Sequence, residues 1–284
     1  MNAPLSLKER IAAEARKPGT HLPVFNPVAM EVQKLLADPD VAIAKIEATL
    51  LRDPALAAQV LRMANSAMYA GLNAVTTLRQ ALTRVGVQQI SRLVLAAAQV
   101  SLYQSRHPLF KKHLSELWKT AFASAIGCAW VAHKSSHGEL AEQAFVAGLL
   151  HDVGKLVILR CIEKLIAEKG IEGPLPDSMA MEMIDALHCE FGHDLMQRWN
   201  LPDIYAVIGR DHHLANSDSG NVLMVIVRLV DQITRKMGIG CTAEPTLEPA
   251  ASEEAGALML SEVAIADLEV TLEDKLGLNV MPQV

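Results

Sequence analysis

The chain has 284 residues, of which 51% are hydrophobic and 4% aromatic, and its formal net charge at pH 7 is −6. The apolar residues are mostly Ala, Leu, Val and Met, which favours helices packed on helices over a β-sandwich of aromatic and β-branched strands. Residues 241–284 hold nine acidic side chains and one basic one, so the rest of the chain has a net charge of +2, and this small basic surplus indicates no nucleic-acid partner.

The sequence indicates neither a secretory signal nor a membrane span. Its first residues, MNAPLSLKERIAAEARKPG, are charged and contain no apolar core of the kind that signal peptides have. The longest apolar stretch, LVLAAAQVSLY, is too short to cross a bilayer and is typical of a buried helix. The four cysteines show no paired C-x-x-C spacing. We therefore expect a cytoplasmic protein with reduced thiols.

The first half of the chain is predicted to be a series of helices. Residues 1–20 are expected to form a short polar helix and a turn, and two helices then follow at 27–36 and 43–51. Asp53 followed by Pro54 is a good helix start, because Asp accepts free backbone N–H groups and Pro fits the first helical position. The pair Thr76-Thr77 is a candidate cap for the next helix, which ends near Gly86 and precedes one more.

The second half is also predicted to be helical, beginning after a seam at Arg106-His107-Pro108. The predicted fold class is therefore all-α: a polar segment at 1–20, a helical half at 21–106, a second helical half at 107–240, and an acidic part at 241–284. In that last part, a Pro-, Glu- and Ala-rich linker at 242–256 is expected to precede an amphipathic helix that packs back on the body. Helices are expected near 112–134, 139–150, 154–169, 178–199, 202–213, 220–237 and 261–276.

The strongest local signal for chemistry is the segment GLLHDVGK at 148–155. It places the imidazole of His151 beside the carboxylate of Asp152, and both groups are suitable ligands for Mg, Mn, Fe or Zn. Gly154 is expected to permit a backbone turn directly after the pair. A His-Asp pair is common by chance, but this one has further candidate ligands downstream, namely His188, His193, His212, His213 and Asp231.

Each downstream candidate also has a purely structural interpretation. His212 and His213 would suit a solvated helix end beside Asp211, where an imidazolium meets the negative end of the helix dipole. Asp231 lies in an otherwise apolar helix, where an unpaired carboxylate is costly, so a metal ion, a His or a helix cap would each offset that cost. His188 and His193 are five residues apart, so only one of them is expected to face the site.

The arrangement as a whole resembles the HD superfamily of metal-dependent phosphohydrolases, and within it the HDOD branch. The similarity extends over about residues 20–240. In the first half it is carried by Leu22-Pro23-Val24, by RDPALAAQVLRMANSAMY at 52–69 and by ALTRVG at 81–86. In the second half it is carried by Leu117-Trp118, GLLHDVGKL at 148–156, HCEFG at 188–192, WNLP at 199–202 and DHH at 211–213.

The resemblance implies a set of site residues. Asp152 and Lys155 would be catalytic, and Lys155 would contact a phosphate. His193 lies beside the family's glycine position and is the weaker candidate. The implied metal ligands are His151, Asp152, His188, His212, His213 and Asp231.

One position departs from the superfamily pattern. The superfamily's first metal histidine lies two residues past a Leu-Trp pair, and here that position is Thr120, whose hydroxyl is a poor ligand for a divalent ion. A site with a single ion on His151, Asp152 and Asp231 remains open. The Gly-Tyr-Pro segment of the cyclic-dinucleotide phosphodiesterases in this superfamily is absent after His213, where the chain reads LANS.

Two functions remain open at this point. The preferred hypothesis is a signal-transduction regulatory module with a degenerate HD metal site, acting through a protein partner or a ligand. The alternative is a metal-dependent phosphohydrolase acting on a nucleotide or a cyclic dinucleotide, with one or two Fe, Mn, Mg or Zn ions. Thr120 favours the first, and the otherwise nearly complete ligand set favours the second. Because the HDOD-like region fills nearly the whole chain, the input signal is expected from a small ligand or a separate protein, and no membrane partner is expected.

The segment Asn65-Ser66-Ala67-Met68-Tyr69 is a second candidate site. Its structural interpretation is a helix end, in which Asn65 and Ser66 bond to local backbone and Tyr69 packs with its hydroxyl at the surface. Its functional interpretation is a surface through which the first half meets a partner.

Overall fold

The computed structural model describes residues 5–17, 23–66, 69, 74–105, 107–171, 175–214 and 220–276. Within these ranges every regular element is a helix, which confirms the predicted all-α class. Arg106 of the predicted seam, Leu22, and Ala67 and Met68 of the second candidate site lie outside the described residues. No helix in the described ranges combines the length and the apolar character that crossing a membrane requires.

The helices follow one another with short connections. Those before residue 107 are α1 (Leu7–Arg16), α2 (Pro27–Leu36), α3 (Ile43–Leu50), α4 (Pro54–Ala64), α5 (Leu78–Val85), α6 (Val87–Val100) and the 3-10 turn η1 (Ser101–Tyr103). Those after it are α7 (Pro108–Lys134), η2 (Gly138–Leu140), α8 (Ala141–Leu150), α9 (Val153–Ala167), α10 (Asp177–Arg198), α11 (Asp203–Asp211), α12 (Val222–Lys236), η3 (Pro249–Ala251), α13 (Glu253–Ala257) and α14 (Glu262–Leu276).

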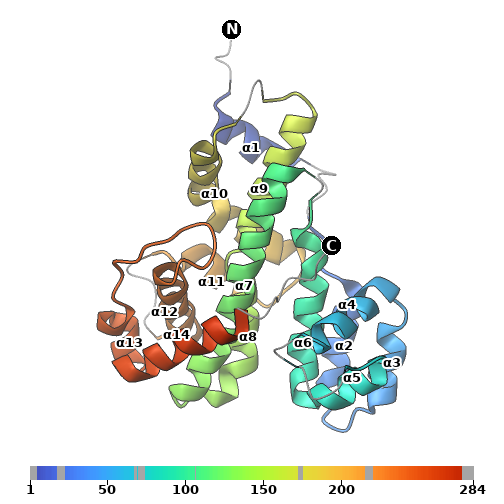
Figure 1. Ribbon diagram of the computed structural model, residues 1–284. Helices are drawn as coiled ribbons and strands as arrows, with labels where there is room; N and C mark the ends of the chain where they lie inside the picture. Colours follow the sequence, from blue (N-terminus) through green and yellow to red (C-terminus); the bar gives the residue numbers. More distant parts are fainter. Residues whose placement is uncertain are drawn as a thin grey trace.

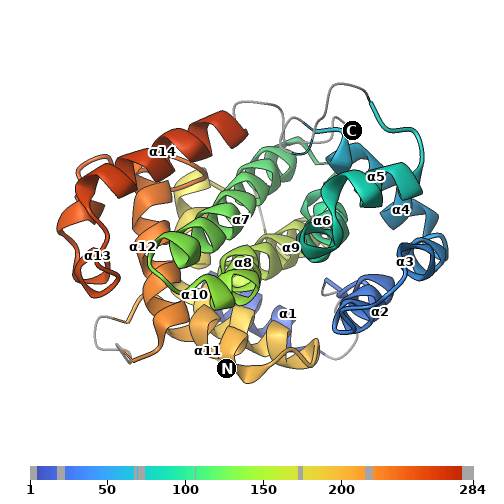
Figure 2. The ribbon, with the colours of Figure 1, turned by 90° about the horizontal axis from the view of Figure 1, so that it is seen from below.

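Helices α2 to α6 form a small bundle on one side of the molecule (Figure 1). Two of them, α4 and α5, start at the caps that the sequence predicted, since the Asp53 carboxylate accepts from Leu56 N at 3.0 Å and Thr77 Oγ1 accepts from Gln80 N at 3.2 Å. The long helix α7 runs through the other half, where it packs against α8, α9 and α12 (Figure 2).

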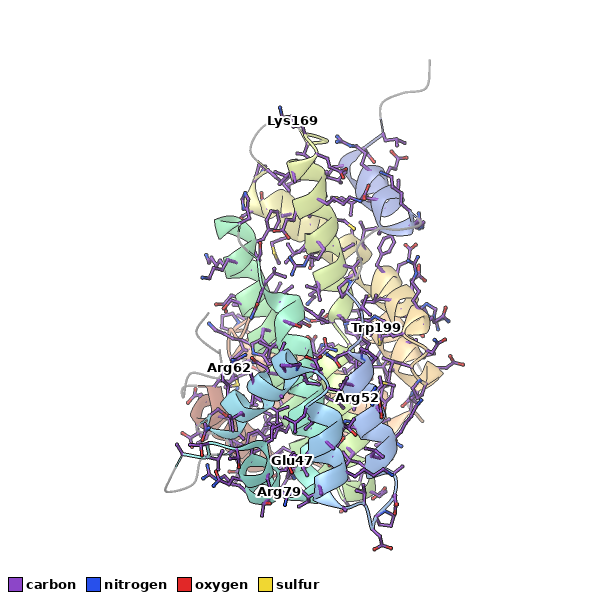
Figure 3. All side chains as sticks on the ribbon, turned by 90° about the vertical axis from the view of Figure 1, so that its right-hand side faces the viewer. Glu47, Arg52, Arg62, Arg79, Lys169 and Trp199 are labelled. Carbon is purple, nitrogen blue, oxygen red and sulfur yellow. The ribbon has the colours of Figure 1, made fainter. Side chains whose placement is uncertain are left out.

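The two halves are joined by contacts close to Trp199, which Figure 3 labels. Its indole Nε1–H donates to Pro23 O at 2.8 Å, and its ring meets Phe25 edge-on with ring centres 5.1 Å apart. A second link lies at the seam, where the Arg160 guanidinium donates to Leu102 O at 2.8 Å. The small bundle is therefore fixed at both of its ends to the half that carries the histidines.

Helix α1 packs on α9 and α10, so the start of the chain contacts the second half. Ile11 and Glu14 are fully buried in this contact. The buried Glu14 carboxylate receives Lys164 Nζ of α9 at 2.6 Å on Oε1 and Lys17 Nζ at 2.5 Å on Oε2. These two ammonium groups, Lys164 first, hold the pKa of Glu14 below its usual range.

The acidic part at the end of the chain differs from its prediction. Residues 242–256 were predicted to be a linker, and this is wrong for η3 and α13, which pack on α12 and bury Ala255. The short helix α13 begins at a cap, in which Ser252 Oγ accepts from Ala255 N at 3.1 Å. The Pro-, Glu- and Ala-rich composition of the segment indicated a linker, and this cap was not predicted from it. The amphipathic helix α14 is as expected, since it packs on α7 and buries Ile265, Leu268 and Leu272.

The segment at 65–69, which follows α4, agrees in part with its structural interpretation as a helix end. Asn65 Nδ2 donates to Val75 O and Asn65 Oδ1 accepts from Val75 N, both at 2.8 Å. Ser66 Oγ donates to Met63 O at 2.6 Å. The surface position expected for the Tyr69 hydroxyl is wrong, because this oxygen is buried without a hydrogen-bond partner. Burial raises the pKa of Tyr69 to about 12.

Candidate metal centre

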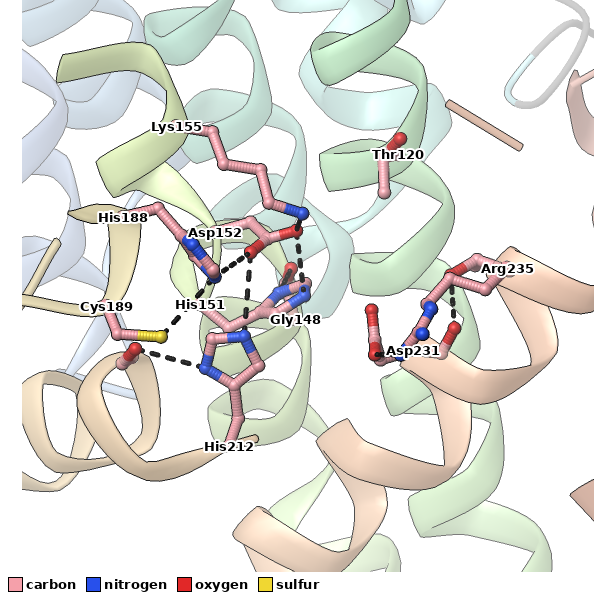
Figure 4. Close-up of polar contacts among 12 residues, drawn as sticks. Thr120, Gly148, His151, Asp152, Lys155, His188, Cys189, His212, Asp231 and Arg235 are labelled. Carbon is pink, nitrogen blue, oxygen red and sulfur yellow. Dashed lines mark hydrogen bonds and ion pairs between the residues drawn. The ribbon is translucent and has the colours of Figure 1, made fainter. Parts of the chain in front are cut away.

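Four helices bring the candidate ligands together in the second half (Figure 4). His151 is the C-cap of α8 and Asp152 the N-cap of α9, so the pair forms the junction between these two helices. His188 lies on α10, and His212 is the C-cap of α11. All four side chains are buried, His151 the most with 1% of its surface exposed.

Gly154 sets the distance between Asp152 and His188. The expected backbone turn at Gly154 is wrong, because α9 begins at Val153 and continues through it. A Cβ at this position would overlap His188 O and would lie 2.6 Å from Gly192 N. Only glycine lets the backbones of α9 and α10 come this close, and the contact places the first turn of α9 against His188.

The three buried histidines share one hydrogen-bond arrangement. Their Nδ1 atoms face backbone carbonyls: His151 faces Gly148 O at 2.8 Å, His188 faces Ile184 O at 2.9 Å, and His212 faces Gly209 O at 3.0 Å. Since a carbonyl can only accept, each Nδ1–H donates and each Nε2 keeps a free lone pair. Carbonyl partners of this kind fix the tautomer of metal-binding histidines.

The lone pairs converge on the Asp152 carboxylate. Oδ1 lies 3.6 Å from Nε2 of His188 and 3.6 Å from Nε2 of His212, and Oδ2 lies 3.5 Å from Nε2 of His151. Two ligand atoms on a tetrahedral divalent ion, each at its usual bond length, are roughly 3.4 Å apart. Nε2 of His151, Nε2 of His212 and Oδ1 of Asp152 are buried without a hydrogen-bond partner among the described residues, whereas Oδ2 of Asp152 faces Lys155 Nζ at 2.6 Å. These donor atoms therefore fit a divalent ion in type and in spacing.

Burial disfavours the charged forms of His151, His188 and His213. Burial lowers the pKa of His151 and of His188, and burial together with His212 lowers the pKa of His213 to about 3. Burial also opposes ionisation of Asp152, but Lys155, whose Nζ lies 2.6 Å from Oδ2, outweighs it and holds the pKa of Asp152 well below its usual range. Lys155 thus supplies the positive charge that the buried carboxylate needs.

Asp231 lies apart from this cluster. Its Oδ2 pairs with Arg235 of the same helix at 3.3 Å. In the described part of the chain, two groups of potential ligands have all their donor atoms within 4.8 Å of one another. One contains His151, Asp152 and His212, the other contains His188, Cys189, His212 and His213, and neither includes Asp231.

Thr120, at the position of the superfamily's first metal histidine, is packed against backbone. Its hydroxyl lies 3.1 Å from Glu116 O and 3.3 Å from Ile239 O, both acceptors. Gly240, with φ of 103°, lies so close that a Cβ there would overlap Thr120 Oγ1. The chain after α12 therefore fills the space beside Thr120 that a longer side chain would need.

The second half contains two further residues that bear on the site. His193 pairs with Asp194 at 3.5 Å, so of the two α10 histidines only His188 joins the cluster, as expected. Cys189 was missed by the sequence analysis, and its Sγ lies 3.4 Å from His188 Nε2. A search for paired cysteines overlooks a thiol of this kind, and the only signal for it was its place next to His188.

A cavity of about 470 Å³ adjoins the cluster, lined among others by His212, His213 and Asp231. The Arg228 guanidinium at its edge donates to His212 O at 3.0 Å and to Asp211 O at 3.3 Å. Arg228 thereby satisfies free carbonyls at the end of α11 and holds His212 in place. Opposite it, Glu254 of α13 accepts a hydrogen bond from Gln232 at 3.0 Å.

Comparison with solved structures finds the same fold in several bacterial proteins. An HDOD domain protein of unknown function from Geobacter sulfurreducens matches with a TM-score of 0.73 and 22% identity, over 98% of this chain and 100% of that one. A candidate metal-dependent phosphohydrolase from Shewanella amazonensis matches with a TM-score of 0.67 and 18% identity, over 95% of this chain and 97% of that one. A candidate signal transduction protein from Marinobacter aquaeolei matches with a TM-score of 0.67 and 22% identity, over 94% of this chain and 63% of that one.

Comparison of the sequence itself gives two matches. An uncharacterized protein of Treponema pallidum is 27% identical over 191 residues, which are 65% of this chain and 36% of that protein. This chain thus spans about a third of the length of that relative. The model of the HDOD domain family matches residues 22–215, from the start of the small bundle to the end of the histidine pair. The chain therefore belongs to the HDOD domain family.

Proposed function

We propose that this protein is a signal-transduction module whose second half holds one divalent ion and which acts by binding a partner or a ligand. One observation carries the proposal: the residues at two positions where the superfamily pattern has metal ligands, here Thr120 and Asp231, both have other partners. Thr120 is packed on Ile239 O and Gly240, and Asp231 is paired with Arg235. The ligands that do converge are His151, Asp152, His188 and His212.

The reduced ligand set argues against hydrolysis. Two-metal phosphohydrolases hold both ions at once, so that one ion activates water while the pair clamps the reacting oxygens. Here the Oδ2 side of Asp152 faces the Lys155 ammonium at 2.6 Å, where a second cation would be repelled. The Oδ1 side faces His188 and His212 and pairs with no Lys or Arg of the described residues. An ion bound there would fix three helices relative to one another.

A regulatory role also suits the arrangement of the two halves. The ligands come from α8, α9, α10 and α11, while the small bundle is fixed to the second half through Trp199, which directly follows α10. A change at the ion or in the adjoining cavity therefore has a short structural route to the small bundle. The relative from Marinobacter aquaeolei, a candidate signal transduction protein, supports this choice.

The second candidate function is a metal-dependent phosphohydrolase acting on a nucleotide or a cyclic dinucleotide. The convergent lone pairs of three buried histidines on Asp152 favour it, as does the cavity beside them. In that case the ion would supply Lewis-acid chemistry, while Lys155 would balance negative charge.

Metal analysis separates the two functions. The purified, tag-free protein is compared with Asp152→Ala and with Asp194→Ala, which removes a half-exposed carboxylate of α10 beside His193 and serves as control. We expect about one ion per chain in the wild type and in the control, and a loss in Asp152→Ala. A parallel screen with phosphatase and phosphodiesterase substrates is expected to give no turnover. Two ions with turnover would establish the hydrolase, and no ion after incubation with Mn, Fe, Mg or Zn would overturn the metal centre altogether.

A further inference from the structure

We infer that Cys189 is a thiolate ligand of the ion, which makes this a zinc-type site with mixed nitrogen, sulfur and oxygen ligands. The inference rests on the single ion proposed above and adds a ligand to it. The sulfur would join His188 and His212, whose Nε2 atoms face Asp152 Oδ1, the carboxylate oxygen away from Lys155.

The distance between Cys189 and His188 fits a shared ion. Sγ and Nε2 are 3.4 Å apart. A tetrahedral zinc with usual bond lengths to sulfur and to nitrogen separates these two atoms by roughly 3.6 Å. The two residues are consecutive on α10, so their side chains leave the helix in different directions, and both must bend towards one point to come this close.

The surroundings of Cys189 also indicate a ligand. Four residues, His188, Cys189, His212 and His213, can each offer one donor atom so that all four atoms lie within 4.8 Å of one another. Within that group, His212 Nε2 is buried without a hydrogen-bond partner, and its imidazole is 0% exposed. An unpartnered buried lone pair is costly, and an ion next to it removes the cost.

The other cysteines have ordinary structural places, which makes Cys189 distinct. Cys128 and Cys161 are buried in the hydrophobic core, and Cys241 is half-buried and packed against it. All four thiols are free, so none is engaged in a disulfide. Cys189 is half-buried and the only one of the four whose sulfur belongs to a group of potential metal ligands in the described part of the chain.

A thiolate ligand changes which ion the site prefers. Sulfur favours Zn and other borderline or soft ions, whereas Mg and Mn prefer oxygen ligands. On binding, the S–H bond breaks, sulfur keeps the electron pair for its bond to the metal, and the proton leaves to solvent. We therefore expect Zn or Co to displace Mg and Mn from this site, and to do so less well when Cys189 is replaced.

Cobalt substitution tests this assignment with a readout that does not depend on activity. A thiolate bound to Co²⁺ gives a near-ultraviolet charge-transfer band, and nitrogen and oxygen ligands alone do not. The wild-type protein and Cys241→Ser, the matched control, should both show the band after loading with Co²⁺. Cys189→Ser should lose the band, and its affinity for Zn should fall by a factor of roughly ten or more. Circular dichroism confirms that each variant is folded.

The outcomes distinguish this inference from the proposed function. If Co²⁺ binds to the wild type with one ion per chain but without the band, Cys189 is no ligand, and the single-ion proposal stands. If Asp152→Ala binds as much Co²⁺ as the wild type, or if neither binds any, the proposed metal centre itself is wrong. X-ray absorption of the zinc protein gives a second check, since a sulfur neighbour at about 2.3 Å is expected.

Discussion

Lys155 Nζ lies 2.6 Å from Oδ2 of Asp152, whose carboxylate also faces Nε2 of His151, His188 and His212. Lys155 is 11% exposed in its side chain and Asp152 7%, so this is a largely buried ion pair. The ammonium takes one side of the carboxylate and leaves the other side to the lone pairs of His188 and His212. The cluster thus contains one cation, the Lys155 ammonium at Oδ2, and we expect the proposed metal ion on the Oδ1 side.

Replacing Lys155 by Met should therefore destabilise the metal-free protein and strengthen metal binding. Removing one partner of a buried pair leaves an uncompensated charge, which costs about 3 kcal/mol. The metal then becomes the only cation near Asp152, so the gain in stability on adding zinc should be larger than in the wild type. Urea unfolding with and without zinc measures both effects. An unchanged free energy of unfolding in the metal-free variant would show that Asp152 does not depend on Lys155.

Gly154→Ala should separate α9 from α10 and abolish metal binding. The added Cβ would overlap His188 O, a backbone atom that cannot rotate away, so we expect a loss of about 3 kcal/mol. Gly256→Ala is the matched control, because a Cβ at that helical position meets nothing within 4 Å. The control should be neutral or stabilised by up to about 1 kcal/mol. Thermal unfolding and zinc titration of both variants, compared side by side, check the prediction.

Thr120→His should not restore the superfamily ligand set. Ile239 O and Gly240 fill the space beside Thr120, so an imidazole has to displace them or adopt a strained rotamer. We expect a loss of about 2 kcal/mol in the free energy of unfolding and no additional ion by elemental analysis. Thr120→Ser, which keeps the hydroxyl, serves as control. A second ion per chain in Thr120→His would mean that the 239–240 backbone yields to the larger side chain.

Glu14→Gln should show the pH dependence of the contact between α1 and α9. Lys164 and then Lys17 lower the pKa of Glu14, and a carboxyl group whose pKa is lowered on folding adds stability above its unfolded pKa. That stability is lost as the pH falls through the folded value. At pH 7 the variant should be less stable by on the order of 1 kcal/mol, and the difference should shrink below about pH 4. Glu182→Gln, at an exposed position on α10, serves as the control for the substitution itself.

The sequence predicts the helices well because their signals are local. The caps at Asp53 and Thr77, for example, need only the next three residues. The composition of the candidate metal cluster was predictable, since His151, Asp152, His188 and His212 were all candidates and the structure brings them together.

Features that depend on distant backbone could not be predicted. The contact of Thr120 with Ile239 O joins residues far apart in sequence. The pair of Asp231 with Arg235 is different, because it spans four residues of one helix and its spacing is visible in the sequence. Gly154 was predicted to allow a turn, because a glycine after a His-Asp pair does not indicate that the backbone of another helix, here α10, lies against it. Cys189 was overlooked because a single thiol carries no spacing pattern.

The packing of α1 on α9 and α10 has a consequence for synthesis of the protein. The second half is built from two separate stretches of chain, and the small bundle of α2 to α6 is inserted between them. On the ribosome, α1 emerges before the inserted bundle, and the helices against which Ile11 and Glu14 are buried emerge only after that bundle, α7 and α8. The bundle has local contacts and can form during translation, whereas α1 can take its place only once α9 and α10 have been made.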